Sequence, residues 1–332
     1  MNWADEAATI MSEALAIENS REKSGIQPTV KRPVSILGVP LCYGADMAGV
    51  ELGPAVLRVA GINQRIARLG YRVRDLGDLE LEHPQKPAAR HDKLKHLLEI
   101  AGACEQLAIE VHKILAAGEF PIVLGGDHSI AIGSIAGVAS HCRERDETLG
   151  LIWFDAHADM NTPETSPSGN IHGMPLGALL GYGATELTNV GGFSPKLDPK
   201  LCAHVGARDI DPGERELIRK LGLRFFTMRE IDQRGMTACM DEAIAIASRG
   251  GGGYAVTFDV DVLDPGDAPG SGTLVRGGLT YREAHLGMEK IAEAGGIVSL
   301  EVVEINTALD LNNKTAQLGV ELILSVLGKT IL

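Results

Sequence analysis

The sequence predicts an α/β fold in which a mostly parallel sheet is covered by helices on both faces. Short apolar runs alternate with longer segments of helical spacing, and parallel strands need crossover connections of that kind. Polar clusters also follow several of the runs directly. Eight runs are candidate strands, at residues 34–39, 72–76, 120–124, 149–154, 201–205, 223–227, 254–258 and 297–303. Periodicity alone does not distinguish an open sheet from an eight-stranded barrel.

Seven stretches have the spacing of helices that bury one face. They cover residues 54–69, 92–117, 129–140, 212–221, 236–248, 280–294 and 314–327. No repeat, linker or low-complexity tract divides residues 32–332, so we expect a single domain there. Residues 1–31 are expected to form an N-terminal appendage that is partly helical, because an apolar-spaced stretch is followed by a polar segment that contains proline.

The composition of the 332 residues excludes a disordered chain, because 45% are hydrophobic and 23% are charged. The net charge of −13 repels nucleic acid and favours small cationic ligands. No run of eighteen apolar residues is present, and the chain starts with acids where a signal peptide carries Lys or Arg. Its five scattered cysteines form no CxxC pair. We therefore expect a cytoplasmic protein with no membrane span and no disulfide.

Polar residues of an unusual kind follow three of the candidate strands. GGDHS occupies residues 125–129, DAHAD residues 155–159 and DVD residues 259–261. Parallel α/β sheets place their binding sites beyond the carboxyl ends of the strands, so these clusters should converge on one crevice. The i, i+2 and i+4 spacing within DAHAD, and the i, i+2 spacing within DVD, direct each set to one side of an extended backbone.

Four carboxylates and two imidazoles would then share a small space. Burying unpaired carboxylates together is costly unless protons or cations compensate their charge. Two divalent ions balance four Asp, and an oxygen-rich set with two imidazoles and no thiolate suits Mn²⁺ better than zinc or copper. For any one residue, a helix cap or a turn former is the alternative. The six residues that together favour a binuclear manganese site are His128, Asp155, His157, Asp159, Asp259 and Asp261.

Several segments resemble the successive signatures of the ureohydrolase family, and within it those of the arginase branch. They are GGDHS, WFDAHADMNTPETSPSGNIHGMP, GARDIDPGE, TFDVDVLDP and EVVEIN, and the resemblance extends over roughly residues 33–331. It implies an open, mostly parallel eight-stranded sheet with helices on both faces. The ligands that it implies for one Mn²⁺ are His128, Asp155, Asp159 and Asp259. Those for the other are Asp155, His157, Asp259 and Asp261.

The resemblance also implies a reaction, the hydrolysis of the guanidinium group of L-arginine to urea and L-ornithine by a hydroxide that bridges the two ions. It implies that Asp159 relays a proton to the leaving amine, that His172 exchanges protons with solvent, and that Glu304 pairs with the guanidinium. The residues that it assigns to the α-carboxylate are Asn161, Ser168 and Asn170. Those for the α-amino group are Asp211 and Glu214, and Thr273 is expected to support Glu304 by a hydrogen bond.

Some alternatives stay open at this point. The DPGE segment is also a helix start, with Pro212 in the first turn and acids near the positive end of the helix dipole. Thr307 stands where the family has a proline, and Ser166 and Pro167 stand where arginases often have threonines. Agmatine, 4-guanidinobutyrate and another guanidino acid are therefore alternative substrates, and a catalytically silent arginine-binding protein is a further alternative. The family implies a homotrimer or homohexamer.

Two other interpretations are weaker. Asp127, His128 and Ser129 are the residue types of a hydrolase triad, but adjacent residues cannot line up as nucleophile, base and orienting group, and no GxSxG motif is present. The RGGGGY segment at 249–254 suggests a phosphate-binding loop, but its glycines precede a candidate strand. Phosphate loops follow a strand and open a helix, so we expect a flexible turn there.

Overall fold

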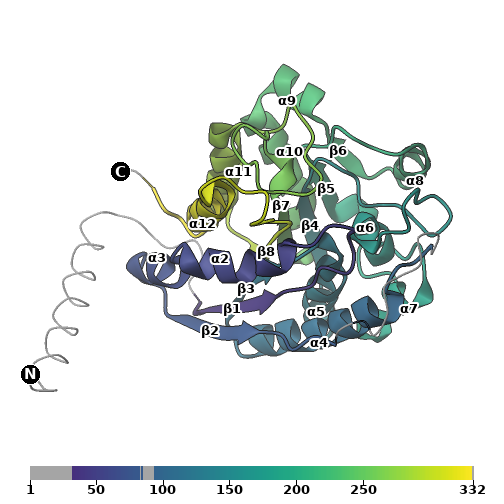
Figure 1. Cartoon of the computed structure of the whole chain (residues 1–332), viewed down its shortest axis with the longest axis horizontal. Helices are drawn as coiled ribbons and strands as arrows, with labels where there is room; N and C mark the ends of the chain where they lie inside the picture. The colour runs from purple at the N-terminus through teal and green to yellow at the C-terminus, as the bar shows by residue number, and fades with distance from the viewer. Residues whose placement is uncertain (1–31, 83, 85–92, 331–332) are drawn as a thin grey trace, which may run out of the picture.

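The structure, a computed structural model, describes residues 32–82, 84 and 93–330, and these form an α/β fold around one sheet (Figure 1). The described residues contribute eight parallel strands in the order β2-β1-β3-β8-β7-β4-β5-β6. The strands are β1 (Val34–Val39), β2 (Val73–Asp78), β3 (Phe120–Gly125), β4 (Thr148–Phe154), β5 (Cys202–Val205), β6 (Arg224–Phe226), β7 (Gly251–Asp259) and β8 (Ile297–Val303). The predicted fold class is confirmed.

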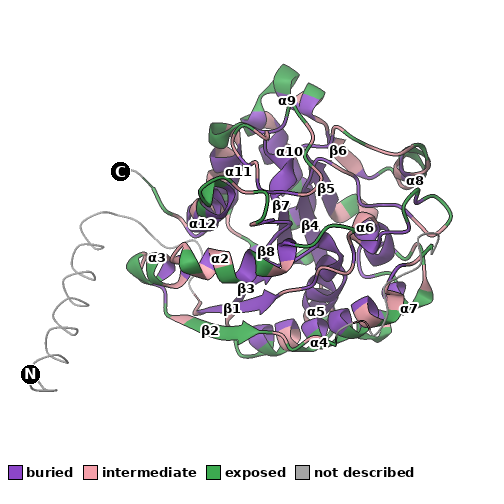
Figure 2. Cartoon of the chain, in the orientation of Figure 1, coloured by how far each residue is buried: buried purple, intermediate pink, exposed green. Residues whose placement is uncertain are grey.

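The sheet is open and is not a barrel. Within the described part of the chain β2 pairs with β1 alone and β6 pairs with β5 alone, so these two strands are the edges. The central strands are buried along almost their whole length, whereas the edge strand β2 is mostly exposed (Figure 2). Strands buried on both faces need continuous apolar runs, and the sequence has such runs at β1, β3 and β4.

Helices cover both faces of the sheet and form two apolar clusters with it. One cluster contains residues of α2 (Gly53–Val59), α3 (Ile62–Arg68), α9 (Met228–Arg234), α10 (Met236–Ala247), α11 (Tyr281–Ala294) and α12 (Lys314–Val326). The other contains residues of α4 (Leu97–Ala116), α5 (Ala131–Arg143), α6 (Pro175–Leu179), α7 (Thr185–Thr188) and α8 (Pro212–Leu221). Because all the strands are parallel, the chain returns to the amino edge of the sheet between strands, which leaves loops at the carboxyl edge free to form a site.

Several elements differ from the sequence predictions, and α6, α7 and α9 were not predicted at all. Three of the other differences have a local cause. The single helix expected at 54–69 is divided into α2 and α3, because Gly61 between them has a left-handed φ of 83°. The helix expected to start at 129 begins as a short 3-10 turn, His128–Ile130, and continues as α5. The glycine segment near 250 is not a flexible turn, since β7 begins at Gly251. A Cβ on Gly250 would lie 2.2 Å from the Thr148 carbonyl oxygen, so glycine permits the close approach to β4.

Other expectations concern the chain as a whole. All five cysteines are described, and each is free. Among the residues that the structure describes, no helix combines the length and apolarity that a membrane crossing requires. The appendage expected at residues 1–31 lies outside the described residues and stays a prediction, as does the single domain at 32–332.

Candidate metal centre

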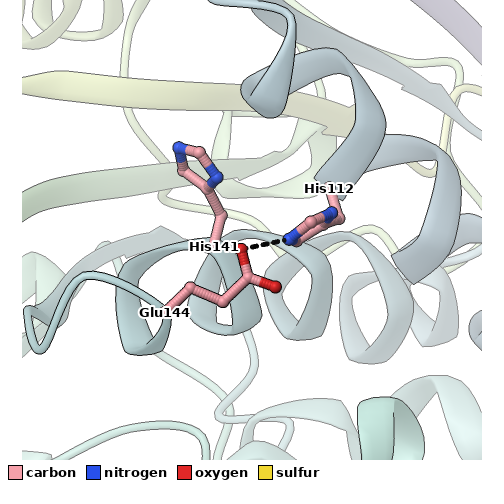
Figure 3. Close-up of side chains that lie close together, drawn as sticks. All are labelled: His112, His141 and Glu144. Atoms are coloured by element: carbon pink, nitrogen blue, oxygen red, sulfur yellow. Dashed lines mark ion pairs between the residues drawn. The ribbon is translucent and has the colours of Figure 1, made fainter.

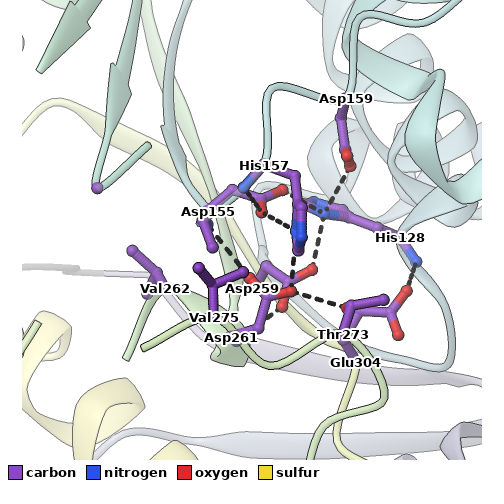
Figure 4. Close-up of polar contacts among 12 residues, drawn as sticks. His128, Asp155, His157, Asp159, Asp259, Asp261, Val262, Thr273, Val275 and Glu304 are labelled. Carbon is purple, nitrogen blue, oxygen red and sulfur yellow. Dashed lines mark hydrogen bonds and ion pairs between the residues drawn. The ribbon is translucent and has the colours of Figure 1, made fainter. Parts of the chain in front are cut away.

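The three polar clusters converge at the carboxyl edge of the middle of the sheet (Figure 4). Strands β3, β8, β7 and β4 are consecutive neighbours there. The side chains brought together are His128 after β3, Asp155, His157 and Asp159 after β4, and Asp259 and Asp261 at the end of β7. All six sequence-predicted ligands therefore lie in one cluster.

His128 faces three carboxylates through a single atom. Its Nδ1 lies 3.2 Å from Asp155 Oδ2, 3.1 Å from Asp159 Oδ2 and 3.2 Å from Asp259 Oδ2. The imidazole is held in this position by Trp153, whose ring stacks on it with 4.3 Å between centroids. The indole Nε1 also donates to Asp155 Oδ2 at 3.0 Å.

His157 faces the other side of the same cluster. Its Nδ1 lies 3.1 Å from Asp261 Oδ2 and 3.4 Å from Asp155 Oδ1. Asp155 thus directs one oxygen toward each imidazole. One potential ligand group contains His128, Asp155 and Asp259, the other contains Asp155, His157 and Asp261, and in each group the ligand atoms lie within 4.8 Å of one another. Asp155 is the residue that the two groups share.

The simpler interpretation of these acids, as turn formers, also holds. Asp155 Oδ1 accepts the His157 backbone N–H at 2.7 Å, and Asp259 Oδ1 accepts that of Asp261 at 2.8 Å. These local hydrogen bonds shape the loops after β4 and β7. The same carboxylates still direct their second oxygen toward His128, so forming the turn and facing the cluster are compatible.

The electrostatics of the cluster require positive charge. Burial raises the pKa of Asp159 to about 7, and the Asp155 carboxylate adds to that rise. Burial and repulsion from Asp261 and Asp155 raise the pKa of Asp259 well above its usual range. Burial acts to lower the pKa of His128, but its three carboxylate contacts raise it well above its usual value. Four acids this close therefore need protons or cations among them.

The donor set fits a pair of divalent cations. Nδ1 of His128 is buried and makes no hydrogen bond of good geometry among the described residues, although three carboxylate oxygens surround it. Four carboxylates supply the charge of two divalent ions, and oxygen donors with imidazole and no thiolate are typical of hard or borderline metals. The identity of the metal is a separate question.

A buried hydrogen-bonded chain behind His128 was missed in the sequence. His128 Nε2 lies 2.9 Å from Thr257 Oγ1, and that hydroxyl donates to Glu301 Oε1 at 2.6 Å. Ser134 Oγ donates to the other oxygen of Glu301 at 2.5 Å. A hydroxyl has one proton, so Thr257 must accept from an Nε2–H of His128. In neutral His128 the lone pair is then on Nδ1, which faces the three carboxylates.

One sequence signal points to this chain. Glu301 is a single acid inside the apolar run IVSLEVV, and a charged residue is rarely buried unless it has partners. Thr257 lies two residues before Asp259 and is also fully buried in β7. Both residues occupy regular strands and belong to no recognisable motif, so the sequence pattern did not predict a role for them.

Glu304 and His172 form a second buried contact at the centre. Glu304 Oε1 accepts the His128 backbone N–H at 2.9 Å and lies 3.1 Å from His172 Nδ1. Burial acts to lower the pKa of His172, but this carboxylate raises it to about 9. The hydrogen bond expected from Thr273 to Glu304 is wrong. In the described structure the Thr273 hydroxyl donates to Asp261 Oδ2 at 2.9 Å, because its loop lies over the end of β7.

Two acids of the centre have a backbone conformation that is unusual for residues other than glycine. Asp159 has a φ of 55° and Glu304 a φ of 64°, both left-handed. Such a conformation costs on the order of 1–3 kcal/mol per residue and clusters at functional sites. Both acids lie in loops that directly follow central strands, where the backbone must turn sharply to bring the carboxylate inward.

A cavity of about 180 Å³ opens onto the centre. Its lining includes His157, Asp159 and Asp259 of the cluster, and also His172. The residues predicted to bind the α-carboxylate and α-amino groups line it as well, and so does Thr273. They are Asn161, Ser168, Asn170, Asp211 and Glu214. Glu304, predicted to pair with the guanidinium, is buried beside His172 and is not part of the lining. Ser166 and Pro167, the two departures from the family pattern, are part of the same wall.

Asp211 and Glu214 combine a helix start with a position on the cavity wall. They form a capping box at the start of α8, in which Glu214 Oε2 accepts the Asp211 backbone N–H at 2.8 Å. The other oxygen of Glu214 accepts the Met160 backbone N–H at 2.9 Å, which ties α8 to the loop after β4. Burial raises the pKa of Glu214 to about 7. Asn161 Nδ2 donates to Asp211 Oδ2 at 2.9 Å.

Lys95 is a further residue that the sequence did not single out. Its Nζ donates to Asn170 Oδ1 at 2.8 Å and also forms an ion pair with Asp46 at 2.7 Å. Because Lys95 occupies the oxygen of the Asn170 amide, that amide can contact a ligand only through its NH₂ group, which also hydrogen-bonds to Asp46. No motif marks Lys95, since it precedes α4 in an otherwise polar stretch.

Comparison with known proteins identifies the family. The sequence matches the arginase family over residues 32–328. An arginase of Bacillus caldovelox is 49% identical over 302 residues, which make up 91% of this chain and 100% of that relative. The chain belongs to the arginase family. This confirms the resemblance found in the sequence.

Solved structures of arginases agree with the arginase-family fold of this chain. The native structure of Bacillus caldovelox arginase at pH 5.6 has a TM-score of 0.86 at 48% identity, covering 91% of this chain and 100% of that one. The arginase of Entamoeba histolytica, solved in complex with L-ornithine, has a TM-score of 0.83 at 31% identity, with coverages of 90% and 99%.

Proposed function

We propose that this member of the arginase family hydrolyses the guanidinium group of L-arginine to urea and L-ornithine, with two Mn²⁺ ions as cofactor. The observation that carries the proposal is the convergence of six potential metal-ligand side chains, three of which line a cavity that also presents amide, hydroxyl and carboxylate groups. The 49% identity to an arginase over nearly the whole chain supports the same conclusion.

The metal ligands are proposed as the family resemblance assigns them. His128, Asp155, Asp159 and Asp259 would hold one ion. Asp155, His157, Asp259 and Asp261 would hold the other, and the position of Asp155 between the two imidazoles supports a bridging role for it. The bound ions would lower the pKa of a water molecule from about 15.7 to about 7 and so supply a nucleophile at neutral pH.

Side chains of the protein would then transfer the protons. Asp159 would accept the proton of the attacking water and deliver it to the nitrogen whose bond to the guanidinium carbon breaks, and its position on the cavity wall suits both transfers. His172 lines the cavity, so it is placed to exchange protons with solvent. Attack adds the water oxygen to carbon, and loss of the protonated amine gives urea and L-ornithine.

Recognition of an α-amino acid would use the cavity wall. Asn161, Ser168 and Asn170 would donate to the α-carboxylate, and the contact of the Asn170 oxygen with Lys95 supports this by assigning the donor role to the NH₂ group. Asp211 and Glu214 would attract the α-ammonium group. Glu304 would pair with the guanidinium beyond the metals, and Thr273 would act through Asp261, to which it donates.

The wider expectations from the sequence belong to this proposal. A homotrimer or homohexamer follows from the family resemblance. A cytoplasmic location is supported by the scattered free cysteines. The net charge of −13 supports a small cationic substrate over nucleic acid or an anionic membrane surface.

The proposal is tested by measuring urea release from L-arginine, agmatine and 4-guanidinobutyrate, using protein loaded separately with Mn²⁺, Zn²⁺ and Mg²⁺. We expect L-arginine with Mn²⁺ to give the highest kcat/KM. A preference for agmatine would contradict the assignment of the α-carboxylate subsite. No urea from any of the three compounds, with metal bound, would favour an arginine-binding protein without catalysis.

A further inference from the structure

A second group of metal-ligand residues lies away from the centre, on the helices α4 and α5 (Figure 3). His112 is on α4, His141 is on α5, and Glu144 is the residue directly after α5. His112 Nε2 lies 2.9 Å from Glu144 Oε2, and the two imidazole rings lie 5.7 Å apart at an angle of 78°. One ligand atom from each of the three residues lies within 4.8 Å of the other two.

Close packing of the two helices brings these residues together. Gly133 and Gly137 lie at intervals of four before His141, and Cys104 and Ala108 lie at intervals of four before His112. A Cβ on Gly133 would lie 2.5 Å from the Cys104 carbonyl oxygen, and a Cβ on Gly137 would lie 2.5 Å from that of Ala108. The helices therefore touch along these glycines, and the histidines occupy the next turn of the same contact.

The group is separate from the candidate metal centre. α5 starts directly after β3, where His128 lies, and ends just before β4 begins. α4 likewise ends just before β3 begins. His112, His141 and Glu144 are therefore at the amino edge of the sheet, whereas the centre is at the carboxyl edge.

In the part of the chain that the structure describes, one nitrogen atom of each imidazole in this group makes no hydrogen bond of good geometry, although His112 Nε2 lies within ion-pair distance of Glu144. Nε2 of His112 and Nδ1 of His141 are shielded from water, and neither makes a hydrogen bond of good geometry among the described residues. The Glu144 side chain is 64% exposed, so the group opens to solvent on one side. Shielded nitrogens beside an exposed carboxylate leave a position where a cation would gain three ligands and retain water.

Neighbouring charges are mixed. Arg145 donates to the His141 carbonyl oxygen and to Glu147, so its charge is largely paired. The positive charge of Arg32 also helps to lower the pKa of His141, after the larger effects of burial, Arg145 and His112. Neither Arg side chain is a metal ligand, and Glu144 supplies the negative charge within the group itself.

We propose that His112, His141 and Glu144 form a surface site for a borderline transition-metal ion of the Zn²⁺ class. Two imidazoles and one carboxylate make a three-ligand set that Zn²⁺ binds tetrahedrally with a water, in contrast to the oxygen-rich centre. A bound ion links α4 to α5 and stabilises the folded state by mass action.

Metal counting tests this site in the full-length protein loaded with Mn²⁺. Wild type and a His112→Asn/His141→Asn double variant are dialysed against buffered Zn²⁺, and bound zinc per chain is measured by mass spectrometry. We expect wild type to bind one more zinc than the double variant, because any exchange at the metal centre affects both alike. His96→Asn, a histidine outside the group, is the matched control and should bind as wild type does.

Glu144→Gln provides a second test if the double variant folds poorly, because it replaces one atom of an exposed side chain and should not disturb folding. We expect it to weaken zinc binding at this site by at least about tenfold. Zn²⁺ should also raise the melting temperature of wild type more than that of either variant. Equal zinc content in wild type and a folded double variant, or equal melting shifts with and without Glu144, would overturn the proposal.

Discussion

The metal centre and the α4–α5 group both combine imidazoles with carboxylates, yet they differ in how strongly they need a cation. Asp155 and Asp261 in the centre have no exposed surface, whereas Glu144 is largely exposed. Water screens the charge of Glu144, but it cannot screen four buried acids. Burial therefore makes a cation a requirement in the centre and an option on the helices.

The origin of the residues differs in the same way. The centre is built from loops at the carboxyl ends of three strands, whose alternation directs every second side chain inward. The α4–α5 group depends on two helices that touch at glycines. Strand-end motifs of Asp and His are rare enough to be noticed in a sequence, but a His and a Glu three residues apart on a helix are common on any surface.

The largest effect expected from this comparison is that of Asp155→Ala. Because Asp155 faces both imidazoles, its loss should empty the centre of metal and lower turnover by several orders of magnitude. The matched variant Glu144→Ala should change turnover by less than about twofold, as is usual for an exposed residue. Urea assays with metal analysis on both proteins check this. Full activity in Asp155→Ala with unchanged metal content would contradict the assignment.

A buried histidine without a carboxylate contact sharpens the comparison. His204 on β5 is fully buried and stacks on Phe225, and burial lowers its pKa to about 4. A lowered folded pKa means that its contribution to stability is present above the unfolded value near 6.5 and is lost as the pH falls through about 4. Between neutral pH and about pH 4, wild type should therefore lose about 3 kcal/mol of its free energy of unfolding through protonation of His204 in the unfolded state. His204→Leu should not show this loss.

Reversible denaturant unfolding of wild type and His204→Leu at several pH values measures this difference. If the free energy of unfolding changes equally in the two proteins between pH 7 and pH 4, burial does not suppress protonation of His204. His285→Leu is not a suitable control, because His285 Nδ1 lies 2.8 Å from Ser325 Oγ and so has a partner.

Thr257→Val tests whether the buried chain behind His128 matters for the metal. Valine matches threonine in shape but cannot accept from Nε2–H, so the orientation of His128 and the position of its lone pair lose their support. We expect metal affinity to fall about 10- to 100-fold. Thr257→Ser keeps the hydroxyl and should stay near wild type. Equilibrium dialysis gives the comparison, and equal affinities in all three proteins would exclude this role.

Asn170→Ala should have the smallest of these effects. Losing one hydrogen bond to a charged group costs about 1.5 kcal/mol, so KM for L-arginine should rise about tenfold while kcat changes little. Metal content should be unaffected, because Asn170 lines the cavity outside the ligand cluster. Steady-state kinetics with metal analysis test this, and a parallel loss of metal would mean that Asn170 supports the centre.

Much of the fold was predictable because each strand is a distinct apolar run between helical segments. The alternation alone did not distinguish an open sheet from a barrel, and it was the family resemblance that implied the open sheet seen in the edge strands β2 and β6. The break at Gly61 was also missed, because one glycine inside a helical pattern is often tolerated. The start of β7 depends on contacts with β4 that local sequence does not record.

The centre was predictable where chemistry is concentrated in motifs, and not where regular elements supply it. His128 and the acids after β4 and β7 stand out, but Thr257 and Glu301 lie within strands. Thr273 was assigned the wrong partner, because the choice between Glu304 and Asp261 depends on how one loop lies over another. Lys95 and Asn170 are 75 positions apart in the sequence, so no local pattern could predict their contact.

The left-handed backbone at Asp159 and Glu304 sets a limit on how this protein can evolve toward heat resistance. Asparagine adopts that conformation more readily than an acid, and an amide at either position would also remove a buried charge. Selection for thermal tolerance alone would therefore favour changes at these two positions, and each change would remove a carboxylate on which the proposed chemistry depends. Improved durability in this enzyme has to come from elsewhere in the chain.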